Sequence, residues 1–193
     1  MRIELIGNDN GDEVIGIAEI QNSNRLKQEE LIQLAKSQSR DSLTVQLLNA
    51  LLIVDDTHLL SAAQNAINAK HGKYMLSRSL DVEIIVFASA QRQIGKALDD
   101  LGVYDGLDEI AVVVVGSDTS LVEDTINNLI EKIGKEVTPA FTATRERIKR
   151  IKDHYQIQDK EIVAISDSEA VEAQLIALSR CVISRVSLVA FDN

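Results

Sequence analysis

One uninterrupted apolar segment near the middle of the chain limits the possible folds more than any other feature. The segment Glu109–Val115 begins with one acidic residue and continues as six aliphatic residues with no polar side chain among them. A run of this length, rich in β-branched residues, is typical of a strand that is buried on both faces. We therefore predict a central buried strand here.

The composition indicates a globular protein with an aliphatic core. Of the 193 residues, 45% are hydrophobic, but only three are Phe, three are Tyr and none is Trp. Leu, Ile, Val and Ala must therefore fill the interior. A chain of this size hides roughly 70% of its unfolded surface on folding, which argues against extensive disorder.

Cysteine content and apolar run length suggest the compartment. Cys181 is the only cysteine, which excludes an intrachain disulfide or a thiolate metal cluster and fits a reducing environment. The chain has no uncharged apolar run of about 18 residues, and its first residues do not resemble a secretory signal. We expect a cytoplasmic protein that does not bind membranes.

Hydrophobic periodicity and turn residues divide most of the chain into short strands and helices. The first two strands form a predicted hairpin, with Asn10-Gly11 in its turn. Strands are predicted at 2–6, 14–20, 43–48, 109–115 and 162–165, and helices at 27–39, 57–70, 91–101, 119–133, 143–155 and 169–187. Gly72 is expected to end the second helix, and Asp167 or Ser168 to cap the last.

The segment 80–88 is ambiguous. Its β-branched residues favour a strand, whereas Ser79 is a good helix N-cap and the apolar residues Leu80, Ile84 and Phe87 share one helical face. In either case the pattern predicts an α/β (mixed α+β) fold. We expect a single domain over residues 1–193, with a small, mostly central sheet and about five or six helices packed around it.

The net charge of −10, from 20 basic and 30 acidic residues, argues against indiscriminate binding to nucleic acid. The charges nevertheless form blocks. Five Lys or Arg residues stand against two acids in Lys70–Lys96, nine acids and no bases follow in Ala97–Glu131, and seven bases stand against two acids in Lys132–Lys152. Such blocks either make local basic surfaces or are ordinary solvated helix faces.

The first basic block contains side chains suited to binding phosphate groups. Phosphate recognition requires several Lys or Arg side chains on one surface, and the nearby Tyr74 could stack on a base. The sequence alone does not separate this reading from ordinary surface charge. The candidate residues are Lys70, His71, Lys73, Arg78, Arg92 and Lys96.

The usual catalytic motifs are missing from the sequence, including phosphate-binding loops, zinc-protease helices and nucleophile elbows. Asp55, Asp56 and His58 are close enough in the sequence to suggest a metal site. Asp55 and His58 would still need a third ligand and supporting residues, neither of which can be identified, and a helix N-terminus favours acidic residues in any case. Cys181 has no histidine near it in the sequence and is expected to pack as a small hydrophobe. We predict no catalytic residue, metal, cofactor or small-molecule substrate.

An ordered series of short segments resembles one known family. The segments are Val45-Gln46-Leu47-Leu48, Leu59-Leu60-Ser61-Ala62-Ala63 with Ala66 and Gly72, Ser79-Leu80-Asp81-Val82-Glu83-Ile84-Ile85, Arg92-Gln93-Ile94 with Ala97-Leu98 and Gly102, and Ile110–Val115. Their order and spacing are similar to the archaeal form of the CGI-type subunit of the KEOPS complex, called EKC in eukaryotes. A weaker match returns at Ser184–Leu188.

This resemblance implies a non-catalytic subunit of the complex that makes threonylcarbamoyl-adenosine in tRNA. The relatives bind and activate the small atypical kinase/ATPase subunit and hold the 3′ end of tRNA. Carried to this chain, the resemblance implies that Lys70, Lys73, Arg78 and Arg92 contact tRNA, with Lys96 and His71 as weaker candidates. It also implies that 80–88 is helical, and it leads us to expect glycine where Ala90 stands.

The last helix is the expected kinase-binding element. Helix-in-groove recognition uses residues at i, i+3, i+4 and i+7. One row with this spacing contains Leu175, Leu178, Val182 and Arg185, and a neighbouring row contains Ile176, Ser179 and Ile183. One row must face the protein's own core, and the sequence leaves open which.

Two other functions remain open at this stage. The acidic net charge favours a protein–protein adaptor that binds the kinase without RNA, and Asp55, Asp56 and His58 leave room for a small metal-dependent enzyme. The sequence also does not determine the oligomeric state, the strand order, or whether the second basic block contacts RNA. That block includes Arg145, Arg147, Lys149 and Arg150.

Overall fold

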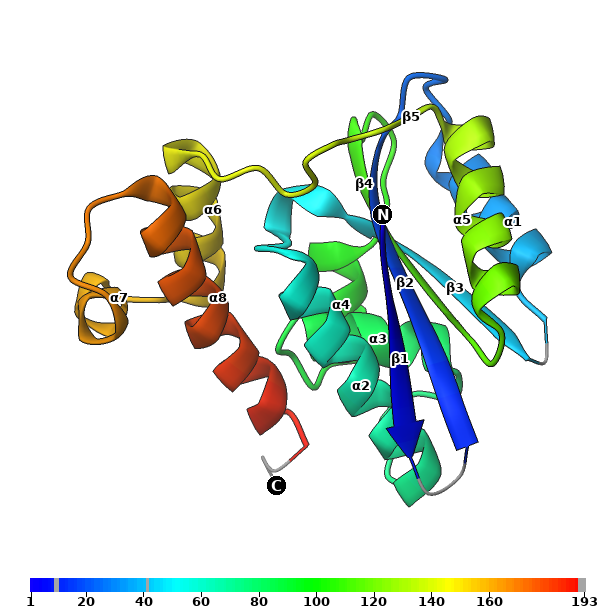
Figure 1. Cartoon of the computed structure of the whole chain (residues 1–193), viewed down its shortest axis with the longest axis horizontal. Helices are drawn as coiled ribbons and strands as arrows, with labels where there is room; N and C mark the ends of the chain where they lie inside the picture. Colours follow the sequence, from blue (N-terminus) through cyan, green and yellow to red (C-terminus); the bar gives the residue numbers. More distant parts are fainter. Residues whose placement is uncertain (9–10, 41, 191–193) are drawn as a thin grey trace.

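The centre of the structure is an antiparallel sheet (Figure 1). Its strands are β1 (Arg2–Asn8), β2 (Gly11–Gln21), β3 (Leu43–Asn49), β4 (Glu109–Gly116) and β5 (Lys135–Glu136). The computed structural model describes residues 1–8, 11–40 and 42–190. The strand order is β1-β2-β4-β3. The short strand β5 pairs with the last residues of β2, past the part of β2 that pairs with β1. The predicted hairpin is confirmed, although Asn10 in its turn lies outside the described residues.

Helices cover both faces of this sheet. They are α1 (Gln28–Gln38), α2 (Asp56–Gly72), α3 (Leu80–Ala88), α4 (Ile94–Leu101), α5 (Thr119–Ile133), α6 (Arg145–Tyr155), α7 (Asp159–Ile165) and α8 (Val171–Leu188), with a 3-10 turn, η1 (Ala50–Leu52), before α2. Figure 1 shows α1 and α5 on one face and α2, α3 and α4 on the other, with α6, α7 and α8 outside α2.

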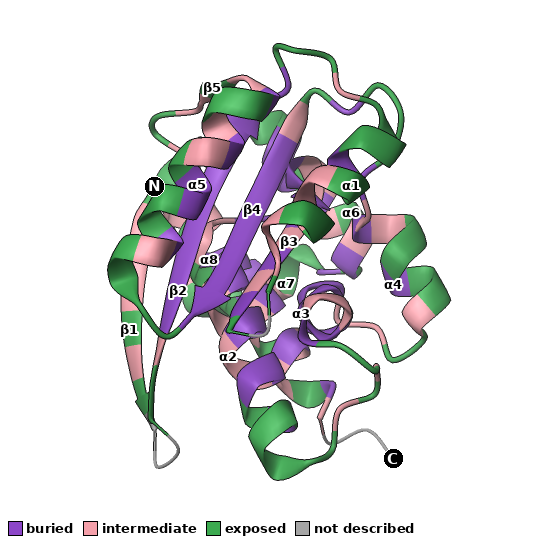
Figure 2. Cartoon of the chain, turned by 90° about the vertical axis from the view of Figure 1, so that its right-hand side faces the viewer, coloured by how far each residue is buried: buried purple, intermediate pink, exposed green. Residues whose placement is uncertain are grey.

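The predicted buried strand is confirmed as β4, which lies between β2 and β3. Its residues alternate between two apolar clusters on opposite sides of the sheet, because successive side chains of a strand point to opposite faces. Val112 and Val114 belong to the cluster under α1 and α5, and Val113 and Val115 to the cluster under α2 and α3. In Figure 2, β4 is coloured as buried along almost its whole length.

The mixed α+β fold class is confirmed, but the described residues contain eight α-helices rather than five or six. The excess comes partly from segment 162–165, which was predicted to be a strand and is the end of α7. Four apolar residues are too few to reveal a period. A capping box between Gln158 and Glu161 starts a helix here, and only Ile162 of this helix is buried.

Three predicted helix ends were wrong by a few residues. α4 begins at Ile94 rather than at Gln91, because Ala90 has a φ of 52° and turns the chain first. α8 begins after Ala170, not after Asp167 or Ser168. α2 continues through Gly72, and the left-handed residue that ends it is Lys73, with a φ of 59°.

The ambiguous segment 80–88 is helical, as the family resemblance implied. Every residue from Glu83 to Ala88 is buried, because α3 lies between α2, α4 and the sheet. Helix packing on several sides therefore outweighs the modest preference of its β-branched residues for strands. Within the described part of the chain, no helix combines the length and the apolar character needed to cross a membrane.

Candidate interaction surfaces

The C-terminal end of α2 presents basic side chains to solvent. Lys70, His71 and Lys73 are all exposed. The helix ends when Lys73 enters the left-handed region and its backbone N–H donates to the carbonyl of Lys70. Positive side chains are favoured here by the helix dipole. His71 Nε2 lies 3.6 Å from the carboxylate of Glu13, so an acidic group borders this surface.

A buried acid shapes the loop that follows α2. The carboxylate of Glu83 has no exposure and accepts hydrogen bonds from the backbone N–H groups of Leu76 and Ser77, at 3.0 and 2.7 Å. The loop carries the exposed Arg78, and Glu83 thereby ties this cation to α3. Sequence analysis missed this function of Glu83. The available signal was one acid surrounded by the apolar residues of a helix.

The two arginine candidates have different surroundings. Arg92 follows α3, and its Nη1 donates to the carbonyl of Val189 at the end of α8, at 2.9 Å. The turn before Arg92 contains Ala90 in the left-handed region that favours glycine, at the position where the family resemblance led us to expect glycine. Arg92 therefore joins α8 to the α3–α4 turn, whereas Arg78 belongs to the loop after α2.

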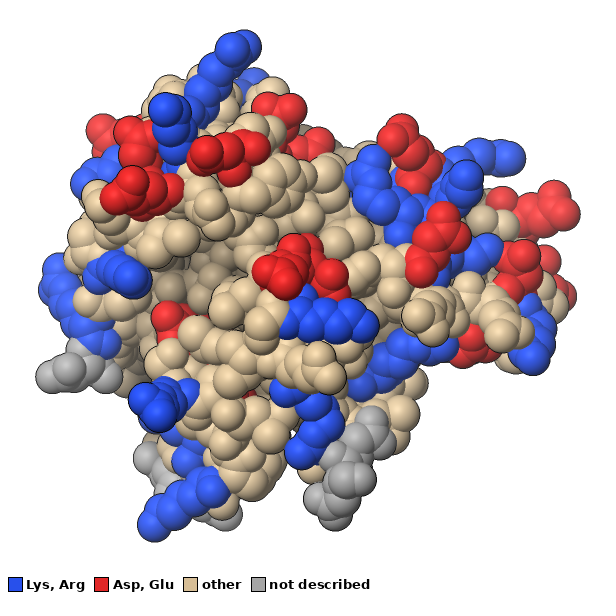
Figure 3. Space-filling model, turned by 180° about the vertical axis from the view of Figure 1, so that it is seen from behind, with Lys and Arg blue, Asp and Glu red and all other residues tan. Residues whose placement is uncertain are grey.

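The structure brings together only part of the predicted basic set. Lys70, His71, Lys73 and Arg78 all belong to the end of α2 and its following loop. The turn after α3 lies near the other end of α2, because the carbonyl of Ala88 contacts His58 in the first turn of that helix. At about 1.5 Å per residue, Lys70 is roughly 18 Å along α2 from His58. Figure 3 shows Lys and Arg side chains gathered at the lower left, over the end of α2.

Lys96 lies in a third neighbourhood, on α4 beside α6. It is exposed. Burial lowers the pKa of His154 on α6, the charge of Asp100 opposes this effect, and the charge of Lys96 adds to it. Because its charge affects the pKa of His154, Lys96 lies near α6 and not near the end of α2.

The structure decides which row of α8 faces inward. Leu178 and Val182 have no exposure and belong to the core beneath α2, and Leu175 packs against the same cluster. Ile176 is 57% exposed, and Ile183 is half-buried. Leu178 and Val182 are thus not available at the surface for a partner. In the neighbouring row Ser179 is buried as well, whereas Ile176 and, in part, Ile183 are accessible; these two residues form the outward row of α8.

The remaining members of the two α8 rows are engaged within the chain. Arg185 Nη2 lies 2.9 Å from the carboxylate of Glu161, which joins α8 to α7. Ser179 is buried, and its hydroxyl lowers the pKa of Asp55 at the start of α2, against the larger raising effect of burial. Arg185 therefore helps to hold α8 against α7, and α8 also contacts α2 and α6.

The aspartate and histidine residues at the start of α2 are occupied by the fold. His58 is fully buried, its Nδ1 accepts a hydrogen bond from the backbone N–H of Val54 at 3.4 Å, and its Nε2 donates to Ala88 at 2.9 Å. Burial lowers the pKa of His58 to about 4. Asp55 caps the helix through the N–H of His58, and Asp56 pairs with Arg2. Among the residues described, no three His, Cys, Asp or Glu side chains are placed to hold a metal.

Cys181 is also buried, and burial is the main reason that the pKa of its thiol is raised. A raised pKa reduces the fraction of thiolate, which is the reactive form. The residue therefore packs as a small hydrophobe, as its sequence context predicted.

The second basic block is not one continuous exposed stripe. Arg147 is only 8% exposed, and its guanidinium donates to the backbone carbonyls of Ala50 and Ile53 and lies 3.6 Å from the buried Glu19. Its function is to join α6 to η1. Arg150 pairs with Glu146 at 2.9 Å. Arg145 and Lys149 are exposed.

The structure combines a mixed α+β scaffold with two accessible surfaces, the basic end of α2 and the outward row of α8. These are features of a binding protein. The family model described as kinase binding protein CGI-121 matches residues 17–190, and the chain therefore belongs to this family. The chain is also similar to a protein named regulatory protein Cgi121 from Methanocaldococcus jannaschii. The two are 32% identical over 109 residues, which cover 56% of this chain and 67% of the relative. The resemblance seen in the sequence is confirmed.

Proposed function

We propose that this chain is the kinase-binding accessory subunit of a KEOPS complex, in which it activates the small atypical kinase/ATPase and helps to hold the 3′ end of tRNA. The observation that carries the proposal is the match to the kinase-binding family over residues 17–190. The protein acts in the cytoplasm as a non-catalytic subunit, without a cofactor. Catalysis then belongs to other subunits, which is consistent with the structural use of Asp55, Asp56 and His58.

The outward row of α8 is the proposed kinase-binding surface. Ile176 and Ile183 are seven residues apart and are the apolar members of this row. The exposed Ile176 and the half-buried Ile183 offer an apolar contact on a helix that packs against the molecule on its other side, which suits insertion into a groove of a partner. Burying one such side chain stabilises a complex by about 1.5–3 kcal/mol.

The kinase claim can be tested by changing Ile176→Glu and measuring binding to the small atypical kinase by calorimetry. We expect the affinity to fall by roughly tenfold or more, because a charge would enter an apolar contact. Leu5→Glu is the matched control, since Leu5 on β1 is 61% exposed and lies outside α8. Equal affinity of the Ile176→Glu variant and the unchanged protein would contradict the proposed surface.

The end of α2 is the proposed tRNA contact, with Lys70, Lys73 and Arg78 as its principal cations and His71 beside them. Arg92 and Lys96 remain secondary candidates because each lies in a different neighbourhood of the fold. Convergent cations bind phosphates and release counterions from the RNA. This local arrangement explains how a protein with a net charge of −10 could bind one end of an RNA.

Fluorescence anisotropy with whole tRNA and with tRNA lacking its 3′ tail tests the RNA claim. We expect weaker binding to the truncated tRNA. The double change Lys70→Glu and Lys73→Gly should weaken binding further and reduce the slope of log affinity against log salt by about 1 for each lost contact. Glycine at position 73 suits the left-handed backbone, so this change removes a charge without straining the helix end.

Lys132→Glu is the control, because Lys132 is an exposed lysine at the end of α5, on the opposite side of the sheet. Equal affinity for the two tRNAs would remove the 3′-end claim. Kinase binding that persists with no measurable tRNA binding would instead favour the second candidate function, a protein–protein adaptor without RNA, which the acidic net charge favours.

A further inference from the structure

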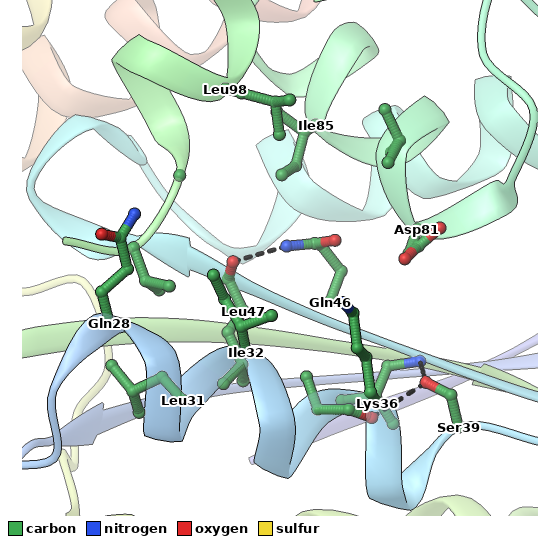
Figure 4. A pocket seen from close by; sticks show the side chains of 15 residues that line it. Gln28, Leu31, Ile32, Lys36, Ser39, Gln46, Leu47, Asp81, Ile85 and Leu98 are labelled. Atoms are coloured by element: carbon green, nitrogen blue, oxygen red, sulfur yellow. Dashed lines mark hydrogen bonds between the residues drawn. The ribbon is translucent and has the colours of Figure 1, made fainter.

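An apolar groove of about 330 Å³ runs along the free edge of the sheet, on the side away from β1. Its floor is formed by β3, one wall by α1 and the other by α3 and α4 (Figure 4). Leu31 and Ile32 line the first wall, and Ile85 and Leu98 line the second. The groove does not include the basic end of α2 or the outward row of α8.

The floor of the groove carries backbone groups of an edge strand. Leu43 exchanges both of its backbone hydrogen bonds with Arg40, at 2.8 and 3.0 Å, and the N–H of Val45 donates to Ser39 Oγ at 3.2 Å. Alternate residues of a strand direct their backbone groups to the same edge. The N–H and carbonyl of Leu47 therefore also point into the groove, away from β4.

Side chains occupy part of this edge in place of another strand. The Nε2 of Gln46 donates to the carbonyl of Leu47 at 2.6 Å, and Ser39 accepts from Val45 as described (Figure 4). The Gln46 bond is one hydrogen bond from a polar side chain, whereas Ser39 Oγ also donates to the carbonyl of Ala35 at 3.0 Å. A main-chain partner would replace the side-chain bonds to Val45 and Leu47 with bonds of similar strength. Val45 and Leu47 are each 2% exposed, so a bound segment must displace the side chain of Gln46 to reach their backbone groups. An edge strand that is bonded to side chains rather than to another strand, between two apolar walls, is an arrangement that binds extended peptides.

We infer that this groove binds an extended segment of a partner protein, which adds to β3 as a further strand. The backbone of the segment bonds to Val45 and Leu47. Because successive side chains of a strand point to opposite faces, its apolar side chains contact α1 and α3–α4 in alternation.

The charges on the two walls specify the bound segment further. Lys36 stands on the α1 wall and Asp81 on the α3 wall, at the same end of the groove (Figure 4). Neither forms an ion pair within the described part of the chain. Neighbouring residues of an added strand face opposite walls, so an adjacent Glu-Lys pair would place its carboxylate toward Lys36 and its ammonium toward Asp81.

A second copy of this chain does not fit the site in the same way. The edge of β3 lies between α1 on one side and α3 and α4 on the other, as Figure 2 also shows from the side. An incoming sheet edge would bring its own covering helices against these walls. A single extended segment has no such layers and can reach the backbone of β3.

The test uses the full chain and a seven-residue synthetic peptide that alternates valine with threonine and ends in an adjacent Glu-Lys pair. Two further peptides carry N-methyl groups on one or the other alternate set of amides. Binding is followed by fluorescence anisotropy and by amide hydrogen exchange. We expect the parent peptide to bind and to slow exchange of the Leu47 amide. One N-methylated peptide should bind like the parent and the other should not bind, because only alternate amides face β3.

Two protein variants locate the site. Leu98→Glu should weaken binding of the parent peptide by roughly tenfold or more, and Ile176→Glu, on the outward row of α8, should leave it unchanged. Exchanging the wall charges, with Lys36→Glu and Asp81→Lys, should reverse the preference between Glu-Lys and Lys-Glu peptides.

Several outcomes would overturn the inference. They are no peptide binding, equal effects of the two N-methylated peptides, or full affinity in the Leu98→Glu protein. A single-stranded oligonucleotide that slows exchange of the Leu47 amide when the peptide does not would assign the groove to RNA instead, and would also overturn it.

Discussion

Glu83, Arg147 and His58 are titratable side chains that this fold buries, and each makes hydrogen bonds to backbone groups of another segment. An unpaired buried polar group costs about 1–3 kcal/mol, which explains why all three are partnered. Glu83 connects α3 to the loop after α2, Arg147 connects α6 to η1, and His58 connects α2 to the end of α3. The position of the basic loop therefore depends on the buried Glu83 as well as on the loop's own residues.

His58 should make the stability of the protein depend on pH. Burial lowers its pKa to about 4 in the folded state, whereas an unfolded histidine titrates near 6.5. Between these values the unfolded state binds more protons, so the free energy of unfolding falls as the pH is lowered from about 6.5 to 4. The expected loss from this residue is roughly 3 kcal/mol.

Chemical denaturation at pH 7 and pH 4.5 measures this effect, with His58→Gln as the comparison. The variant should be less stable at pH 7 and should lose less stability on acidification. Some loss will remain, because the pKa of His154 is also lowered by burial. Should the variant fail to fold, an NMR titration of the His58 ring in the unchanged protein decides the matter, and a pKa near 6.5 would show the prediction to be wrong.

At the scale of the element, packing determines structure wherever local preferences are weak. Segment 80–88 has residues that suit a strand but is enclosed as a helix, and 162–165 follows a capping box and continues as a helix although its apolar run suggested a strand. Close approach of elements depends on single residues. β2 passes beneath α5 at Gly16, where an added Cβ would lie 2.5 Å from Ile126 Cδ1 and 2.6 Å from Val122 Cγ1.

Gly16→Ala should lower the free energy of unfolding by about 1–3 kcal/mol, because overpacking forces α5 away from the sheet. Thermal or chemical denaturation measures the change. Gly95→Ala is the matched control, since an added Cβ in α4 meets nothing within 4 Å and alanine favours a helix by up to about 1 kcal/mol. Equal effects of the two substitutions would contradict this account of the contact between α5 and β2.

At the scale of the whole molecule, the proposed surfaces lie on different parts of one scaffold. The basic end of α2 and the outward row of α8 belong to separate regions of Figure 1, and the groove along β3 lies on a third side. Mutations that are far apart and share no partners usually have additive effects. Binding at one surface should therefore be altered without altering binding at another.

This separation predicts a simple pattern for combined variants. Ile176→Glu should leave tRNA affinity unchanged, and Lys70→Glu should leave kinase affinity unchanged. The double variant should show the kinase loss of the first variant and the tRNA loss of the second, each within about 0.5 kcal/mol. Calorimetry with the kinase and anisotropy with tRNA give both quantities. A loss of kinase binding in the Lys70→Glu protein would mean that the two surfaces are coupled.

By itself, the sequence determined the features that depend on neighbouring residues: the central strand at 109–115, the aliphatic core, most helices, and the family to which the chain belongs. These follow from periodicity, caps and ordered motifs, all of which are local. Only the tertiary structure decided that Arg147 is buried, that Leu178 and Val182 face inward, and that Arg92 reaches α8 instead of joining the cations at the end of α2. The physical reason is that burial and convergence depend on residues far apart in the chain, whose contacts no local pattern records.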